Sequence, residues 1–147
     1  VAGKKAVNPD CFRLGDLLTC QDWPRPSSAK ETTMTILIAG TVEMSPRDRD
    51  HALAEAAALM ADTRAQQGCV HYVWSADPTS DQRIYVFENW ETTEDLAAHL
   101  AGPYYSRMLA LLGKYGALNA DVSKFRVDLE EPVYDPQGKP RADFFTG

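Results

Sequence analysis

The sequence predicts an α+β domain with the ferredoxin-like element order β-α-β-β-α-β and a single antiparallel sheet. Four segments carry the apolar and β-branched patterns of strands. Segments with apolar residues at helical spacing join the first strand to the second and the third to the fourth. Only a short turn-forming stretch, 78–81, separates the second strand from the third, which is typical of a hairpin. The domain is expected over residues 35–130, with an N-terminal arm at 1–34 and a C-terminal tail at 131–147.

The first strand and the first helix open this domain. Residues 35–44, TILIAGTVEM, are apolar on both sides of the chain, which indicates a strand covered on both faces. Ser45 is a favourable N-cap, Pro46 suits the first helical position, and Asp48 stands where a capping box places an acid. The helix is expected to end at Gly68. Its predicted apolar stripe consists of Leu53, Ala56, Ala57, Met60 and Ala61.

The hairpin and the second helical region follow. The hairpin strands are CVHYVWSAD and QRIYVFENW, residues 69–77 and 82–90. Thr92 and Asp95 form the cap of the next helix, and the Gly-Pro pair at 102–103 breaks it. The inner side of this helix is expected to carry Leu96 and Leu100.

A last helix and a last strand complete the predicted order. The helix is expected over residues 104–115, and residues 121–130, DVSKFRVDLE, alternate as a strand. The inward residues of the helix are predicted to be Met108, Leu111, Leu112 and Tyr115. The apolar members of the strand are Val122, Phe125, Val127 and Leu129.

Both faces of the predicted sheet are apolar. In the second strand the alternating sets are Val70, Tyr72 and Trp74 against Cys69, His71 and Val73. The helices of this element order can cover only one face, so the other face needs a second cover. The simplest cover is the same sheet of another copy, related by a two-fold axis. The sequence therefore predicts a homodimer.

The composition argues against several classes of function. The 147 residues are 44% apolar and 24% charged, which is normal for a globular protein, and the net charge of −6 argues against nucleic acid as the main partner. No apolar run is long enough to span a membrane, and no signal peptide is expected at the N-terminus. The odd number of cysteines, at unrelated spacings, favours a reducing cytoplasm, although a Cys11–Cys20 bridge is conceivable.

Motifs for common cofactors and for hydrolysis are absent: there is no GxGxxG, P-loop, Gly-x-Ser-x-Gly or HExxH. His51 is expected on the solvated side of the first helix. Cys69 and His71 could form half of a metal site, because alternation sends both to one face of the sheet. No convincing second pair of ligands follows, so no metal is predicted.

Aromatic residues gather around the end of the third strand. The set is Tyr72, Trp74, Tyr85, Phe87, Trp90, Tyr104 and Tyr105. Such a set suits a flat aromatic ligand held by stacking. His99, on the following helix, could act as a general base near neutral pH or hydrogen-bond a phenolic oxygen. The same residues could instead be ordinary core packing, and the pattern alone leaves both interpretations open.

Three stretches, QGCVHYVWSADP, YVFENWETTEDLAAHL and GPYYSRM, resemble the antibiotic biosynthesis monooxygenase family, whose domain is a dimeric α+β barrel. The matching positions are Gly68, Cys69, Tyr72, Asp77, Glu88, Trp90, Leu96 and His99. The resemblance covers roughly residues 34–130, so the arm and the tail are extra. We expect both to embrace a partner subunit, with Trp23 and Phe144-Phe145 as anchors.

The resemblance implies oxidation of a hydroxylated aromatic, a hydroquinone or an anthrone-like polyketide, to a quinone by O₂ without any cofactor. His99 would assist deprotonation or bind a phenolate, and Trp90 and Asn89 are the other catalytic candidates. Strand alternation places Asn89 opposite Trp90, so whether Asn89 points into the site stays open. The substrate-binding candidates are Tyr72, Trp74, Phe87, Tyr104, Tyr105 and Arg83.

Two other functions remain open at this point. Haem-degrading relatives of this fold carry an Asn, a Trp and an iron-ligating His at positions that correspond here to about Gly40, His99 and Met108, so all three depart from that pattern. The third possibility is that the domain binds an aromatic ligand without turnover, or mainly dimerises.

Overall fold

The computed structural model describes residues 34–144 of the chain. Of these, residues 34–129 form one compact unit, and residues 130–144 belong to another. The predicted anchors Trp23 and Phe145 lie outside the described residues. The elements in order are β1 (Thr35–Glu43), α1 (Arg49–Arg64), β2 (Cys69–Ala76), β3 (Arg83–Trp90), α2 (Thr93–Ala101), α3 (Pro103–Lys114) and β4 (Asn119–Val127).

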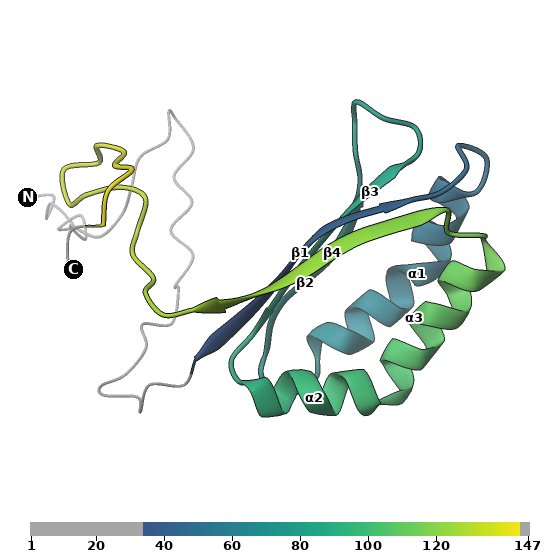
Figure 1. Cartoon of the computed structure of the whole chain (residues 1–147), viewed down its shortest axis with the longest axis horizontal. Helices are drawn as coiled ribbons and strands as arrows, with labels where there is room; N and C mark the ends of the chain where they lie inside the picture. The colour runs from purple at the N-terminus through teal and green to yellow at the C-terminus, as the bar shows by residue number, and fades with distance from the viewer. Residues whose placement is uncertain (1–33, 145–147) are drawn as a thin grey trace, which may run out of the picture. The chain divides into compact units, whose positions relative to one another are not determined.

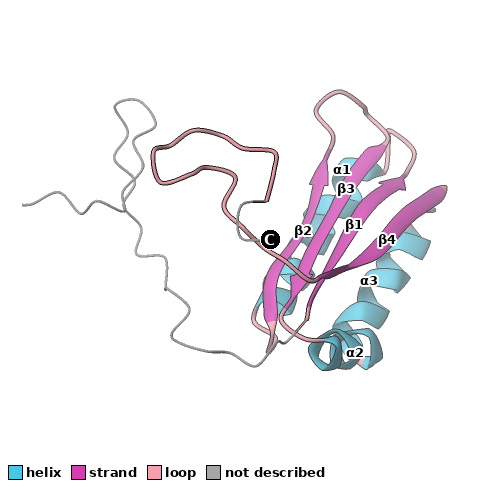
Figure 2. Ribbon diagram, turned by 60° about the vertical axis from the view of Figure 1, so that its left-hand side comes forward, coloured by secondary structure: helices cyan, strands magenta, loops and turns pink. Residues whose placement is uncertain are grey.

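The four strands form one antiparallel sheet in the order β2-β3-β1-β4. This order confirms the predicted ferredoxin-like fold. All three helices lie on the same side of the sheet (Figures 1 and 2). Because the sheet has a single helix layer, one of its faces carries no helix. None of the helices in residues 34–144 is long and apolar enough to cross a membrane.

The strand register assigns every sheet residue to one of two faces. The helix-covered face contains the buried strand residues Ile36, Val42, Tyr72, Ile84, Val86, Glu88 and Trp90. The open face contains the intervening residues, of which Val73, Tyr85, Phe87 and Phe125 are large, apolar and exposed. All the buried strand residues therefore lie beneath the helices.

Helix α1 differs from its prediction at both its start and its buried side. It begins at Arg49, three residues after the predicted Pro46. The Ser45 hydroxyl donates to the Asp48 carboxylate (2.6 Å), and no side chain caps the first backbone N–H groups. The buried line runs through Ala52, Ala56, Leu59 and Thr63, whereas the predicted stripe members Ala57 and Ala61 are exposed. Alanines lie on several sides of this helix, so helical spacing alone could not choose its inner side.

The second helical region breaks where the sequence predicted. Thr92 is the N-cap of α2, and Pro103 starts α3 after a backbone turn at Gly102. Leu96 is buried as predicted, but Leu100 is 42% exposed and His99 takes the second inner position of α2. In α3, Met108 and Leu111 are buried, and the predicted Leu112 and Tyr115 are half-buried.

Strand β4 is the exposed edge of the sheet. It starts two residues earlier than predicted, and nearly all of its residues are exposed. Gly40 of β1 permits its close approach, because a Cβ atom at that position would lie 2.1 Å from the Asp121 carbonyl oxygen. Leu129, a predicted strand member, lies beyond the end of β4.

Candidate functional site

His99 is positioned by the start of its own helix. The Asp95 N–H donates to Thr92 Oγ1 (3.0 Å), and this cap sets the phase of α2 so that Leu96 and His99 both turn inward. His99 is only 2% exposed. His99, and not the predicted Leu100, therefore shares the inner side of α2 with Leu96.

Three aromatic rings surround His99, and we call them the aromatic cluster: Tyr72 of β2, Trp90 of β3 and Tyr105 of α3. The His99 ring centroid lies 4.7 Å from that of Trp90 in a tilted arrangement. It lies 5.6 Å from Tyr72 and 5.8 Å from Tyr105, both edge to face. The structure thus brings together four of the predicted site residues from four separate elements.

The two ring nitrogens of His99 have different surroundings. Nδ1 lies 2.7 Å from Oε1 of Gln66, in the connection between α1 and β2. Nε2 is buried and has no hydrogen-bond partner within the described part of the chain. Burial lowers the pKa of His99, so the neutral imidazole is favoured. A buried polar atom without a partner is unusual and calls for an explanation.

A buried carboxyl group, that of Glu88, is hydrogen-bonded to Trp90. The Trp90 indole N–H donates to Glu88 Oε2 (3.1 Å), because residues two apart on a strand share a face. This bond accounts for the Glu-x-Trp pattern in the sequence. Glu88 is 6% exposed, and burial raises its pKa. Burial also raises the pKa of Tyr72, with a further contribution from Glu88, so the phenol stays protonated.

Trp74, Tyr104 and Cys69 pack against the same core without a ring contact to His99. Trp74 and Tyr104, both predicted to bind substrate, are half-buried and border the cluster from β2 and α3. Burial raises the pKa of the Cys69 thiol to about 11, so it remains protonated at neutral pH. An irregularity in β2 between Cys69 and His71 puts these two side chains on opposite faces, which corrects the predicted shared face.

Asn89 and Phe87 lie on the open face, away from His99. Their register partners there are His71 and Val73, and the His71 and Phe87 rings meet edge to face at 6.0 Å. The strand alternation noted in the sequence therefore holds for Asn89, which points away from Trp90.

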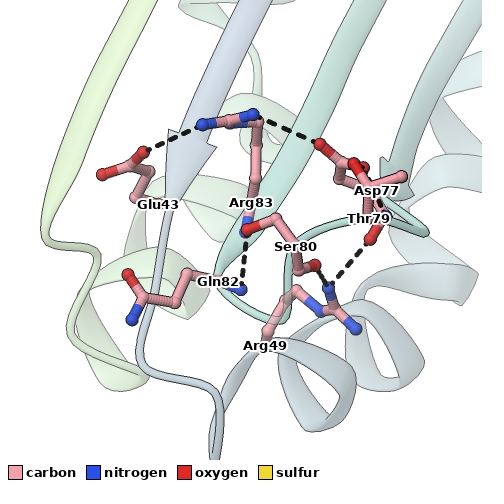
Figure 3. Close-up of polar contacts among 7 residues, drawn as sticks. All are labelled: Glu43, Arg49, Asp77, Thr79, Ser80, Gln82 and Arg83. Carbon is pink, nitrogen blue, oxygen red and sulfur yellow. Dashed lines mark hydrogen bonds and ion pairs between the residues drawn. The ribbon is translucent and has the colours of Figure 1, made fainter.

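Arg83 lies at the opposite end of β3 from Trp90, about 23 Å away along the strand. Its guanidinium approaches Asp77 (3.3 Å) and Glu43 (3.8 Å), as Figure 3 shows. Hydrogen bonds from Thr79 hold the pKa of Asp77 below its usual value, and Arg83 adds to this effect. Arg49 donates to the Asp77 and Ser80 carbonyl oxygens and ties α1 to this turn. These contacts secure the hairpin and do not bring Arg83 to the aromatic cluster.

Two of the positions that correspond to functional residues of haem-degrading relatives, Gly40 and Met108, are poorly accessible to a ligand. Met108 is 2% exposed within the core, and Gly40 backs directly onto β4. Across residues 34–144, no group of three or more His, Cys, Asp and Glu side chains could hold a metal ion.

Sequence reasoning missed Gln66 and gave Glu88 no role in the site. Glu88 could have been found, because its position two residues before Trp90 on a strand places both side chains on one face. Gln66 lies 33 residues before His99, and no local pattern marks that contact.

Comparison with known proteins agrees with this geometry. Residues 35–111 match the family model described as antibiotic biosynthesis monooxygenase. An uncharacterised protein of Synechocystis is 23% identical over 107 residues, which cover 71% of this chain and 73% of that protein.

Solved structures share the fold at low sequence identity. A Deinococcus radiodurans protein named for the same family superposes with a TM-score of 0.61 at 18% identity, over 66% of this chain and 96% of the other. A conserved protein of unknown function from Bacteroides thetaiotaomicron gives 0.59 at 22% identity, over 65% of this chain and 99% of the other. The family model spans more than half of the residues and includes the whole aromatic cluster, so the chain belongs to the antibiotic biosynthesis monooxygenase family.

Proposed function

We propose that this protein is an oxidoreductase that uses O₂ to convert a hydroxylated aromatic compound, a hydroquinone or an anthrone-like polyketide, to a quinone. The observation that carries the proposal is the buried His99 inside the aromatic cluster, with Nε2 unpartnered and with a pKa that burial lowers. A neutral imidazole can take a proton from a phenol, and the surrounding rings suit a flat aromatic molecule. Membership of the monooxygenase family supports the use of O₂.

The proposed reaction requires the protein only to bind the substrate and to accept a proton from it. Deprotonation makes the aromatic substrate electron-rich enough to pass an electron to O₂. For an anthrone, the methylene carbon loses two hydrogens and gains one oxygen atom, and the second oxygen atom leaves as water. The protein would orient the ring, accept the proton and exclude water.

The structure supports different roles for the predicted residues. His99 is the proton acceptor, and Trp90, Tyr72 and Tyr105 are the ring-binding walls. Trp74 and Tyr104 border that space and would complete it. For Asn89, Phe87 and Arg83, contact with substrate stays a prediction that no distance in the structure supports.

Oxygen uptake with anthrone or a dihydroxynaphthalene tests the proposal. His99→Gln should lower the rate by about 100-fold or more, the usual contribution of a general base. Trp90→Phe should also lower the rate. His51→Gln is the matched control, because His51 is exposed on α1. Binding of these compounds at micromolar concentration without any O₂ consumption would contradict the proposed reaction.

Close packing of the cluster favours a second candidate, in which the domain mainly dimerises and the cluster is part of its core. Trp90, Tyr72 and His99 are 0%, 1% and 2% exposed, so their rings are closely packed. For this candidate, a dihydroxynaphthalene should cause neither saturable quenching of tryptophan fluorescence nor oxygen uptake.

The partner that we propose for the open face is a second copy of the chain. Val73 of β2, Tyr85 and Phe87 of β3 and Phe125 of β4 expose apolar surface on this face, and β1 lies between β3 and β4. Contiguous apolar surface of this kind on a sheet is typical of an interaction site. Two copies related by a two-fold axis would cover each other with the same residues.

A further inference from the structure

Gln66 contacts the proposed base directly. Its side-chain oxygen lies 2.7 Å from His99 Nδ1. A carbonyl oxygen only accepts hydrogen bonds, so Nδ1 must carry the proton in this arrangement. A neutral imidazole holds one proton, so Nε2 is left with its lone pair. This nitrogen is the buried atom without a partner.

The backbone around Gln66 is fixed on both sides. The Gln66 N–H donates to the Thr63 carbonyl (3.0 Å), and the Gln66 carbonyl accepts from the Cys69 N–H (3.2 Å). These bonds hold the connection between the end of α1 and the start of β2. The side chain of Gln66 therefore leaves from a rigid turn.

The same turn is attached to the helix that carries His99. The Glu91 N–H, just before α2, donates to the Gly68 carbonyl (2.8 Å). Gly68 has a φ of +71°, and a Cβ atom there would lie 2.2 Å from the Asp95 side chain in the first turn of α2. The turn and the helix start are thus in contact, which fixes where Gln66 and His99 meet.

We propose that Gln66 is a positioning residue that holds His99 in the Nδ1-protonated tautomer, so that Nε2 faces the aromatic cluster as a proton acceptor. The catalytic use of Nε2 rests on the proposed function, whereas the tautomer itself does not. The ionisable groups near His99 are the Tyr72 phenol, the Tyr105 phenol and the Glu88 carboxyl, which accepts from the Trp90 indole.

Long-range ¹H–¹⁵N NMR of the full chain reads the tautomer without any turnover. At pH 7.5, His99 should show a protonated Nδ1 and an unprotonated Nε2. Gln66→Leu should abolish this preference and give a mixture or the Nε2-protonated form. Gln67→Leu is the matched control, because the adjacent Gln67 is exposed, and it should leave the His99 signals unchanged. The exposed His51 serves as an internal reference in every spectrum.

A second variant covers the case in which Gln66→Leu fails to fold. Gln66→Glu keeps an acceptor for Nδ1–H and adds a negative charge, which should preserve the tautomer and raise the pKa of His99. The acid limb of the rate against pH should then move to higher pH, because the base must be unprotonated. In Gln66→Leu, the rate of oxygen uptake with anthrone should fall by about tenfold or more.

Two outcomes would overturn the inference. One is a wild-type spectrum with the proton on Nε2, which would mean that the Gln66 amide group donates to Nδ1. The other is an unchanged tautomer in Gln66→Leu. If the tautomer behaves as expected but no substrate consumes O₂, the proposed reaction fails while the role of Gln66 in positioning His99 stands.

Discussion

The two faces of the sheet are built from alternate residues of the same strands, yet they have opposite environments. In β3, Ile84, Val86 and Trp90 are at most 3% exposed beneath the helices. Their neighbours Tyr85 and Phe87 are 46% and 38% exposed on the open face. The hydrophobic character of the two sets is similar, so the helix layer alone creates the difference.

The polar groups of the two faces differ in the same way. The helix-covered side encloses Glu88 and His99, whose pKa values are shifted by burial toward their neutral forms. The open face carries His71, which is exposed. Chemistry is therefore expected under the helices, and association is expected on the open face.

We expect the largest effect on stability from the loss of an aromatic ring on the helix-covered face of the sheet. Trp90→Ala should lower the free energy of unfolding by about 3–5 kcal/mol, because it leaves a cavity in the core and removes the hydrogen bond to Glu88. Phe87→Ala, on the open face, should lower the free energy of unfolding much less when it is measured at low protein concentration. Urea denaturation of both variants measures the difference. Equal losses would show that the two faces are equally buried in solution.

Charge on the open face should act on association. Phe87→Asp is expected to weaken the proposed dimer by about tenfold or more, since it removes apolar burial and adds a charge to the contact. Leu109→Asp is the control, because Leu109 is similarly exposed but belongs to α3. Sedimentation analysis over a range of concentrations reports the dissociation constant. A wild-type chain that stays monomeric at micromolar concentration would refute the dimer.

We expect the smallest effect on stability from substitution of the buried Glu88 carboxyl, and this effect should depend on pH. Burial raises the pKa of Glu88 above its value in the unfolded chain, so the folded state loses stability as the pH rises through that raised pKa. Glu88→Gln keeps an acceptor for the Trp90 N–H and should become increasingly more stable than wild type from pH 4 to pH 7.5.

The control for this pH series is Asp121→Asn, at an exposed position of the edge strand β4. Thermal unfolding of both variants at several pH values should show a growing difference from wild type only for Glu88→Gln. A pH-independent difference for Glu88→Gln would mean that the Glu88 carboxyl is not desolvated.

Local patterns were sufficient for most of the fold. The hairpin, the Thr92 cap and the break at Gly102 depend on neighbouring residues, and each lies where the sequence predicted it. The start of α1 was predicted wrongly, and its inner side only in part: Ala56 is buried and Leu53 and Met60 pack against the core, but Ala57 and Ala61 are exposed. At the start, the Ser45 hydroxyl donates to the Asp48 carboxylate and does not cap a backbone N–H group. On the inner side, the prediction was difficult because alanines lie on several sides of the helix.

The sequence by itself determined the element order, the excess of apolar residues on both faces of the sheet, and the cap that starts α2. Those features follow from periodicity and capping, which act over a few residues. Only the tertiary structure decided that Trp90 and Tyr72 belong with His99 while Phe87 and Asn89 do not, and that Gln66 contacts Nδ1. The physical reason is that these contacts join residues far apart in the chain. Strand register and helix packing bring those residues together, and local sequence patterns do not record either.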